Sequence, residues 1–451
     1  MTVTGRAAAV SPARAVAYAV LRRVFEQDAW TDRALHGELQ RAGLDGRDRA
    51  LATQLAYGTV QRAATLDHVI ATLAGRPVAR LQPPLLAALR LGVFQLAFLD
   101  GVADHAAVGE SVELAKADAP RGAGLVNAVL RRAAREGRAL VEALPDVTPA
   151  EAALRHSHPE WIAELWFEAL GADDARALMA AGNRPAETAV RANALRTTAE
   201  ALAAELPVAS RPAERLPEGL VLEGAFDAFG SPLWEQGAFM PQSRAAMAVA
   251  RVLAPRPGDR VLDLCAAPGG KTTHLAALME GRGAVVAVER HPGRAQALAR
   301  TAARMGAGNV EVRTGDAAEP HEAGAYDRVL VDPPCSDLGT LASRPDARWR
   351  KLASAPAELA GLQGAILRAG ADALRPGGTL VYSTCTISPA ENEGVVDAFL
   401  ADRRDFSADD LGSSEWSLWQ HGTRPMFLQT LPHRDRTDGF FIARLRRSEA
   451  V

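Results

Sequence analysis

The chain contains little cysteine, little lysine and no long hydrophobic run. Three cysteines in 451 residues are too few for a disulfide framework, and no two of them have the spacing of a zinc site. No stretch approaches the roughly 18 consecutive apolar residues of a membrane-spanning helix, so we expect no contact with a membrane. Residues 1–14 lack a long apolar segment, which predicts no secretory signal and a cytoplasmic protein.

The composition is that of an ordinary globular protein. Apolar residues make up 48% of the chain and charged residues 23%, which excludes disorder as the main state. The 51 basic and 54 acidic residues give a net charge of −3, so the whole chain is not a polycation. Arginine supplies nearly all the positive charge, and a GC-rich coding bias would explain this excess. At about 150 residues per domain, the length predicts about three domains.

Residues 12–140 are predicted to be helical throughout. Leu85, Leu89, Val93 and Leu96 recur at helical spacing and form one apolar stripe. We therefore expect an all-α domain over 1–140. The segment 121–138 brings five basic residues close together: Arg121, Arg131, Arg132, Arg135 and Arg138. These arginines form either a solvated helix face or a patch that contacts RNA phosphates, because arginine pairs well with phosphate oxygens.

A segment with several prolines, 141–150, is predicted to be a linker to a second domain over 150–235. Trp161 and Trp166 lie on a predicted helix, and short β-like runs follow at 188–193 and near 219–222. This pattern indicates a small α+β module, whose function periodicity does not reveal.

Strand and helix patterns alternate in the third predicted domain, 236–451. The expected strands are 261–264, 284–289, 310–313, 326–331 and 379–384. Alternation of this kind predicts an α/β fold, with a parallel sheet that carries helices on both faces. Ligands of such sheets bind at the carboxyl ends of the strands. All three cysteines, Cys265, Cys335 and Cys385, lie at or just beyond a predicted strand end.

A glycine-rich turn follows the first of these strands. Its Gly-Gly-Lys-Thr sequence resembles a phosphate-binding loop, but Cys265 stands where that loop has its first glycine. Glu289 ends the second strand, where an acidic residue suits ribose hydroxyls, and Asp316 follows the third. This set favours S-adenosylmethionine over a nucleoside triphosphate, which stays the alternative. The predicted contacts in the turn are Cys265, Ala266, Ala267, Pro268, Gly269, Gly270 and Lys271.

Two further strand ends carry thiols. The fourth strand leads into Asp332-Pro-Pro-Cys335, and the fifth into a turn with Cys385. We expect both thiols to face one cleft, where Lys271 supplies the positive charge that favours a thiolate. The structural alternative is that these are simply buried cysteines.

A thiolate gives a methyltransferase a way to modify a pyrimidine. Carbon C5 of the base is too weakly nucleophilic to attack a methyl sulfonium, but addition of sulfur at C6 makes C5 enamine-like. Asp332 near N3 would stabilise the charge that develops on the ring. The base has to be flipped out or single-stranded. These residues alone do not tell which thiol attacks.

The motifs together resemble those of RNA cytosine-5 methyltransferases, and most closely the bacterial small-subunit rRNA branch of that family. The similar segments are 263–272, 332–336, 383–386, 391–393 and 438–441, and in the helical region 91–96 and 126–131 resemble the NusB-like domain of this branch. The resemblance covers roughly residues 12–446. It implies a NusB-like helical RNA-binding domain, a small RNA-positioning module and a seven-stranded Rossmann-like methyltransferase domain.

The resemblance also implies roles. Cys385 would attack C6, Cys335 would assist breakdown of the adduct, and Asp332 would also contact the cofactor. It implies S-adenosylmethionine as cofactor, 16S rRNA as partner, 5-methylcytosine as product, no metal and a monomer. The alternatives are the same chemistry on tRNA and a non-catalytic RNA-binding or antitermination factor.

The chain departs from the family pattern at two positions. Gln242 is followed by Ser243 where aspartate is usual, and Asp337 stands where glycine or alanine is common. We expect neither departure to touch the thiols.

Overall fold

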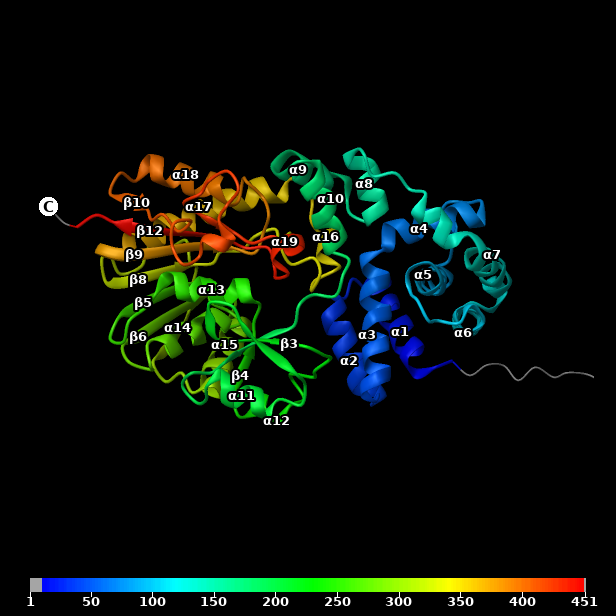
Figure 1. Ribbon diagram of the computed structural model, residues 1–451, viewed down its shortest axis with the longest axis horizontal. Coiled ribbons are helices and arrows are strands. Elements are labelled where there is room, and N and C mark those ends of the chain that lie inside the picture. Colours follow the sequence, from blue (N-terminus) through cyan, green and yellow to red (C-terminus); the bar gives the residue numbers. More distant parts are fainter. Residues whose placement is uncertain (1–9, 450–451) are drawn as a thin grey trace, which may run out of the picture. The chain divides into compact units, whose positions relative to one another are not determined.

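The computed structural model describes residues 10–449 and divides into two compact units (Figure 1). The first unit comprises residues 10–185 and the segment Leu341–Arg350, and the second comprises Ala186–Thr340 and 351–449. Residues 1–9, which hold most of the segment expected not to be a secretory signal, lie outside the described residues. No described helix is long and apolar enough to cross a membrane.

The first unit is all-helical, as predicted for 12–140. Its apolar stripes bury one large core that includes Leu55, Leu89, Val93 and Leu130. The predicted region contains α1 (Pro12–Gln27), α2 (Thr31–Ala42), α3 (Gly46–Gln61), α4 (Ala63–Ala74), η1 (Val78–Arg80), α5 (Pro83–Phe98), α6 (Asp104–Asp118), η2 (Pro120–Gly122) and α7 (Ala123–Glu142).

Two features of the sequence set how these helices begin and pack. Pro83 and Pro84 start α5, since proline fits the first turn of a helix without loss of a hydrogen bond. Gly58 lets α3 approach α5 closely, because a Cβ there would lie 2.0 Å from Cζ of Phe94. Any larger residue at position 58 would displace the Phe94 ring from the core.

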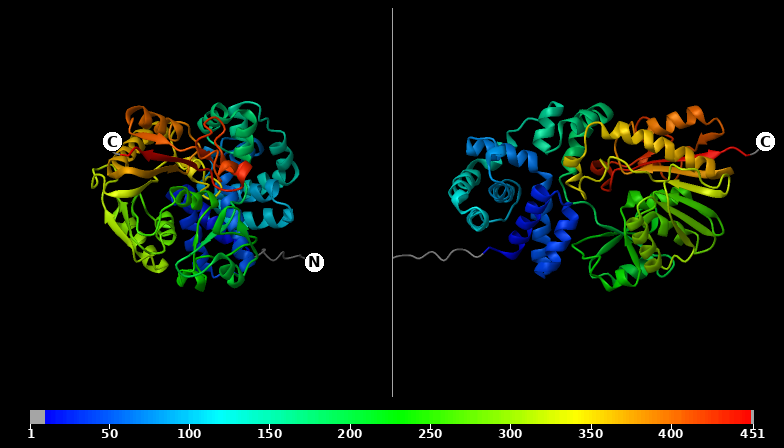
Figure 2. Two further views of the ribbon diagram at one scale, coloured as in Figure 1. Left: turned by 60° about the vertical axis from the view of Figure 1, so that its left-hand side comes forward. Right: turned by 180° about the vertical axis from the view of Figure 1, so that it is seen from behind.

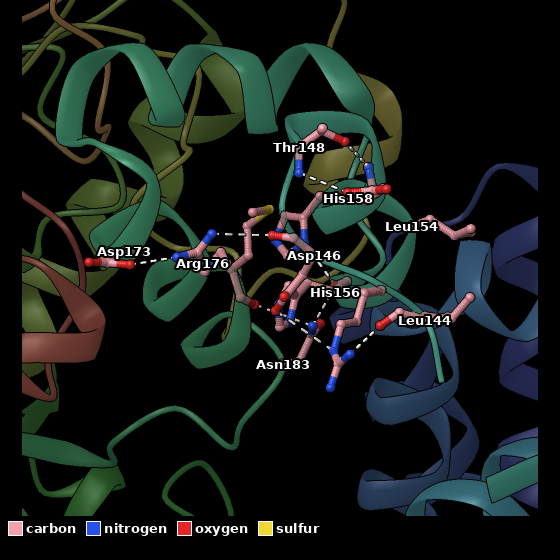
Figure 3. A network of polar contacts seen from close by, with 12 residues as sticks. Leu144, Asp146, Thr148, Leu154, His156, His158, Asp173, Arg176 and Asn183 are labelled. Carbon is pink, nitrogen blue, oxygen red and sulfur yellow. Dashed lines mark hydrogen bonds and ion pairs between the residues drawn. The ribbon is translucent and has the colours of Figure 1, made fainter. Parts of the chain in front are cut away.

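The predicted linker, 141–150, leads into three helices of the first unit: α8 (Pro149–His156), α9 (Glu160–Leu170) and α10 (Ala172–Ala181). Thr148 and Glu151 form a capping box at the start of α8. The main-chain oxygen of Asp146 accepts a hydrogen bond from Arg176 of α10, and that of Leu144 accepts one from Arg155 of α8 (Figure 3). Hydrogen bonds thus fix the linker against the helices that follow it.

A buried arginine attaches Leu341–Arg350 to the first unit. The segment ends in α16 (Ala347–Arg350), and its Arg348 is fully buried. The Arg348 guanidinium donates only to neutral oxygens: the main-chain oxygens of Gln61, Ser157, Gly182 and Leu341, and Oδ1 of Asn183. Burial lowers the pKa of Arg348 to about 9. The five acceptors offset the cost of burying this charge.

The second unit begins with a four-stranded antiparallel sheet in the order β2-β3-β1-β4. Strands β1 and β3 coincide with the runs predicted at 188–193 and 219–222. Its elements are β1 (Ala189–Ala192), α11 (Ala199–Glu205), β2 (Ser210–Ala213), β3 (Leu216–Leu222), α12 (Pro232–Glu235) and β4 (Phe239–Pro241). Arg191 of β1 is fully buried and donates to Gln242 and Thr273.

The larger sheet of this unit has the order β10-β12-β9-β8-β5-β6-β7, and β12 is antiparallel to its neighbours. The predicted seven strands are confirmed along this path, and the short β11 pairs with β12 as an eighth. The strands are β5 (Arg260–Leu264), β6 (Ala284–Glu289), β7 (Val310–Thr314), β8 (Tyr326–Val331), β9 (Leu374–Thr384), β10 (Phe406–Ala408), β11 (Leu428–Gln429) and β12 (Phe441–Arg447).

Helices cover both faces of the larger sheet, as predicted (Figure 2). Successive strand residues point to opposite faces: Val261 packs against α13 and α14, whereas Leu262 packs against α17 and α18. The helices are α13 (Arg244–Leu253), α14 (Gly270–Leu278), α15 (Pro292–Met305), α17 (Ala355–Ala373) and α18 (Glu393–Asp402), with short turns η3 (Ser417–Trp419) and α19 (Pro432–Asp435).

The compact units differ from the three predicted domains in their extent. The first unit runs past the predicted boundary near 150 and ends at Pro185, and the second contains both sheets. A compact unit can contain more than one sequence domain. The division into domains over 1–140, 150–235 and 236–451 therefore stays a prediction.

Candidate functional site

The glycine-rich turn after β5 is shaped by backbone conformation and close packing. Cys265 and Gly269 both have positive φ, of 64° and 102°. A Cβ on Gly269 would lie 2.7 Å from Leu298, so only glycine fits there. Thr272 donates a hydrogen bond of 2.6 Å to the buried Asp263, and burial raises the pKa of Asp263 to about 7. A hydrogen bond to the carboxyl group of Asp263 in β5 therefore stabilises the turn.

The acidic residues predicted to bind a cofactor follow neighbouring strands of the same sheet edge. Glu289 ends β6, is almost fully buried and accepts a hydrogen bond of 2.9 Å from the main-chain N–H of His291. Asp316 follows β7 and accepts from the N–H of Ala318. Asp332 follows β8. Because the strand order is β8-β5-β6-β7, these carboxylates and the glycine-rich turn lie along one continuous edge.

Lys271 pairs with Asp332 in this edge. Its Nζ lies 2.8 Å from Oδ2 of Asp332, while Oδ1 accepts a hydrogen bond of 2.9 Å from Ser383. Burial disfavours the ammonium form, but the charge and hydrogen bond of Asp332 outweigh it and raise the pKa of Lys271. Partners from α14 and β9 thus fix both side-chain oxygens of Asp332.

The two thiols predicted to share a cleft do meet. Cys335 follows β8 and Cys385 follows β9, and their sulfur atoms lie 3.3 Å apart although the residues are 50 positions apart in the sequence. Parallel pairing of β8 with β9, which aligns Val331 with Tyr382, brings the two turns together. Both cysteines are free thiols.

A buried carboxyl group behind the thiols fixes the turn of Cys335. Glu391 is fully buried and accepts hydrogen bonds from the N–H and the hydroxyl of Ser336, at 2.8 and 2.5 Å, and from Gln363 at 3.0 Å. Burial raises its pKa. Glu391 appeared in the sequence only as part of a family motif, because a single carboxylate beyond a strand end has no distinctive spacing. Gln363 of α17 carried no signal.

The expectation that Asp337 does not touch the thiols is wrong. Its Oδ1 lies 3.2 Å from Sγ of Cys385 and 3.8 Å from Sγ of Cys335. A positive φ of 61° at Asp337 turns the chain back over Cys335, and Nζ of Lys351 lies 3.5 Å from its Oδ2. A sequence comparison by motif could not place this side chain, because the backbone turn decides where it points. Ser243, the other departure, caps α13.

The expectation that Lys271 favours a thiolate is also wrong for Cys385. The neighbouring Cys335 thiol, burial and the charges of Asp337 and Asp332 all raise the pKa of Cys385 well above its ordinary value. Burial and nearby carboxylates likewise raise the pKa of Cys265. The charge of Lys271 is already paired with Asp332, so the thiols of Cys385 and Cys265 keep their protons near neutral pH.

Among the described residues, Cys335, Asp337 and Cys385 form a group whose potential ligand atoms lie within 4.8 Å of one another. This spacing suits capture of a thiophilic cation as well as proton transfer. The prediction that no metal takes part in the function therefore stays a prediction.

All five predicted RNA-contacting arginines are exposed on the first unit, Arg121 on η2 and the others on α7. Four of them have partners in this unit. Arg132 donates to the main-chain oxygen of Leu73 at 2.5 Å, and Arg138 pairs with Asp100 at 3.0 Å. Arg131 donates to Asn127 at 3.2 Å, and Arg135 donates to the main-chain oxygen of Arg131 at 3.0 Å. Arg131, Arg135 and Arg138 lie on one face of α7. Phosphate binding by this face stays a prediction.

Comparisons with known proteins agree with this architecture. Sequence models match in three consecutive regions: the NusB family over residues 11–135, a "Methyltr_RsmF/B-like, ferredoxin-like domain" over 158–228 and "16S rRNA methyltransferase RsmB/F" over 250–446. The chain is 38% identical over 450 residues to the "Probable ribosomal RNA small subunit methyltransferase B" of Synechocystis sp., which covers 97% of this chain and 99% of the relative. The chain belongs to the 16S rRNA methyltransferase RsmB/F family.

Further relatives of this RsmB/F chain support the same conclusion. The "Ribosomal RNA small subunit methyltransferase B" of Thermus thermophilus is 38% identical, with 96% of this chain and 97% of the relative covered. The crystal structure of PH0851 matches 98% of this chain and 100% of its own at a TM-score of 0.82 and 26% identity. NSun6 from Pyrococcus horikoshii, solved with SFG, matches 65% of this chain and 99% of its own at 0.59 and 25% identity. The predicted NusB-like domain and methyltransferase fold are thereby confirmed.

The geometry of the thiol pair predicts how Cys385 responds to pH. Because its pKa is raised, the rate of alkylation of Cys385 by iodoacetamide should still be rising at a pH where a free cysteine, with a pKa of about 8.5, has levelled off. Replacement of Cys335 by alanine removes the largest cause and should shift the curve to lower pH. Mass spectrometry of the alkylated peptide measures both curves; an unchanged curve in the variant would contradict this account.

Proposed function

We propose that this RsmB/F methyltransferase transfers a methyl group from S-adenosylmethionine to C5 of a cytosine in 16S rRNA, through a covalent bond between Cys385 and C6. The observation that carries the proposal is the pair of free thiols, 3.3 Å apart, beside the carboxylate of Asp332 at one sheet edge. A methyltransferase that acts on an exocyclic amine or a hydroxyl has no use for two thiols at that position.

The residues of the sheet edge suit S-adenosylmethionine. Glu289 would bind the ribose hydroxyls, Asp316 would accept from the adenine amino group, and Asp332 and the turn over Cys265–Lys271 would hold the rest of the molecule. The clash that any Cβ at Gly269 would make shows how closely the turn already packs on α15. When bound, S-adenosylmethionine supplies the electrophilic methyl group.

The thiols would act on the base in sequence. Sulfur of Cys385 bonds to C6, which makes C5 nucleophilic enough to take the methyl group. Cys335, 3.3 Å away, then accepts the C5 proton, and the electron pair of the C5–H bond expels sulfur from C6. Asp332 and Lys271, already joined by a 2.8 Å contact, would stabilise the charge that develops near N3.

The substrate is assigned on the relatives and on the appended helical domain. The curated relatives are named ribosomal RNA small subunit methyltransferases, and the NusB family matches residues 11–135. The same chemistry on tRNA is the second candidate. A non-catalytic RNA-binding factor is disfavoured by the preserved thiol pair. A cytoplasmic location and a monomer remain predictions of the sequence.

Labelled S-adenosylmethionine tests the proposed reaction directly. The purified protein should form 5-methylcytidine in small-subunit rRNA and none in bulk tRNA, as identified by nucleoside analysis. Label in tRNA alone would overturn the substrate, and failure to bind S-adenosylmethionine in a calorimetric titration would overturn the reaction.

Single cysteine variants separate the two thiol roles. Cys385→Ala should abolish methyl transfer, because no nucleophile then reaches C6. Cys335→Ala should leave a protein–RNA adduct that survives denaturation, because the adduct forms but is not resolved. Gel electrophoresis under denaturing conditions detects the adduct, and the parent chain is the control. Normal methylation by Cys385→Ala would show that the roles are wrongly assigned.

The exposed arginines of α7 should contribute to RNA affinity through phosphate contacts. Replacement of Arg131, Arg135 and Arg138 by alanine should make the slope of log K against log salt shallower by about 2, since each phosphate contact adds about 0.7–0.9. A control with the same loss of charge replaces three exposed arginines elsewhere in the first unit, Arg33, Arg47 and Arg76. Equal slopes in the two variants would show that the α7 face is an ordinary solvated surface that makes no phosphate contacts of its own.

A further inference from the structure

Asp337 places a carboxylate against the sulfur that the proposed function makes the nucleophile. Its Oδ1 lies 3.2 Å from Sγ of Cys385, within the range of an S–H···O hydrogen bond. The left-handed backbone at Asp337 aims the side chain toward β9, and the loop is held there by a hydrogen bond of 3.0 Å from the N–H of Gly339 to the main-chain oxygen of Cys385. The contact therefore follows from the fixed path of the loop.

We propose that Asp337 is a catalytic residue: its carboxylate takes the thiol proton of Cys385 as sulfur bonds to C6, and returns it when sulfur leaves. This rests on the proposed function and adds to it the group that generates the nucleophile. A positioned base within hydrogen-bond reach of the proton is the first geometric requirement of general base catalysis.

The other carboxyl groups near the thiols are engaged elsewhere. Both oxygens of Asp332 have partners, Lys271 and Ser383. The oxygens of Glu391 are taken by Ser336 and Gln363. Asp337 is the carboxylate to which the Cys385 thiol donates in the structure. Lys351, 3.5 Å from its Oδ2, offsets the negative charge that Asp337 brings to the site.

The state of the thiol supports the need for such a base. Cys335, Asp337 and Asp332 raise the pKa of Cys385, and Lys271 is a cation that interacts with this thiol. The proton therefore remains on sulfur near neutral pH and has to be removed during attack.

Every proton that moves in the proposed cycle has a donor and an acceptor. In the attack, the S–H bond of Cys385 breaks, its proton moves to Oδ1 of Asp337, the S–C6 bond forms and the C5–C6 π pair moves toward C5. After methyl transfer the C5 proton leaves to a base, which the proposed function assigns to Cys335. The C6–S bond then breaks, its electron pair stays on sulfur, and Asp337 returns its proton there. The only net proton released is that of C5.

Variants at position 337 test the proposal through the rate of adduct formation. The probe is small-subunit rRNA that contains 5-fluorocytidine, from which the adduct cannot be resolved after methyl transfer because C5 carries no proton. Single-turnover adduct formation should be about 100-fold slower with Asp337→Asn near pH 7. The difference in rate between Asp337→Asn and the parent should become smaller as the pH rises, because hydroxide can then remove the thiol proton in place of the carboxylate. A rate within threefold of the parent chain, or a parallel pH profile, overturns the proposal.

A second variant distinguishes a missing base from a disturbed loop. Asp337→Gly suits the positive φ at this position and opens a space in which formate can stand in for the carboxylate. Added formate should accelerate adduct formation by Asp337→Gly and leave Asp337→Asn and the parent unchanged. Absence of this rescue, in a variant that binds S-adenosylmethionine normally by calorimetry, counts against the proposal.

Two controls separate this inference from the proposed function. Glu280→Gln alters an exposed carboxylate just beyond the C-terminal end of α14 and should keep the parent rate. Cys385→Ala should form no adduct at any pH, and if it does, the proposed function itself fails. All rates are measured with a chelator present, because Cys335, Asp337 and Cys385 are spaced to capture a thiophilic cation.

Discussion

Parallel pairing of β8 with β9 is the interaction on which the site depends. It joins two turns that are far apart in the sequence and sets their sulfur atoms 3.3 Å from each other. The pairing alone does not orient the side chains. That task falls to the buried Glu391, whose hydrogen bonds to Ser336 and Gln363 replace the hydration that its carboxyl group loses. The chemistry thus rests on a buried polar network whose acceptors are all occupied.

Much of the fold was predictable, because the apolar periodicity of each segment agrees with the helix or strand that it forms. The apolar stripe of 85–96 became α5, and the five predicted strands became β5 to β9 in a sheet with helices on both faces. The cysteines could be placed at strand ends for the same reason, since the carboxyl ends of parallel strands share an edge. The eighth strand escaped notice because two residues, Leu428 and Gln429, carry no periodicity.

The parts of the site that sequence reasoning missed are those set by backbone path and burial. Asp337 reaches Cys385 because its φ is positive, and the residues around it do not predict a turn of this kind. Lys271 was expected to activate a thiol, but its nearest partner is Asp332, and a paired ammonium no longer offers its full charge. The motifs therefore predicted which residues lie at the sheet edge. The charge interactions between these residues depend on their distances, which the sequence does not give.

The segment Leu341–Arg350 has a consequence for the integrity of the chain. Because it belongs to the first unit while the residues on both sides belong to the second, the polypeptide passes between the units three times. A protease that cuts once, after Pro185, would divide the chain into two fragments, but Leu341–Arg350 would still hold them together through the noncovalent contacts of Arg348 in the first unit. The loop that begins at Cys335 is thus also a tether, anchored at its far end by the buried guanidinium of Arg348.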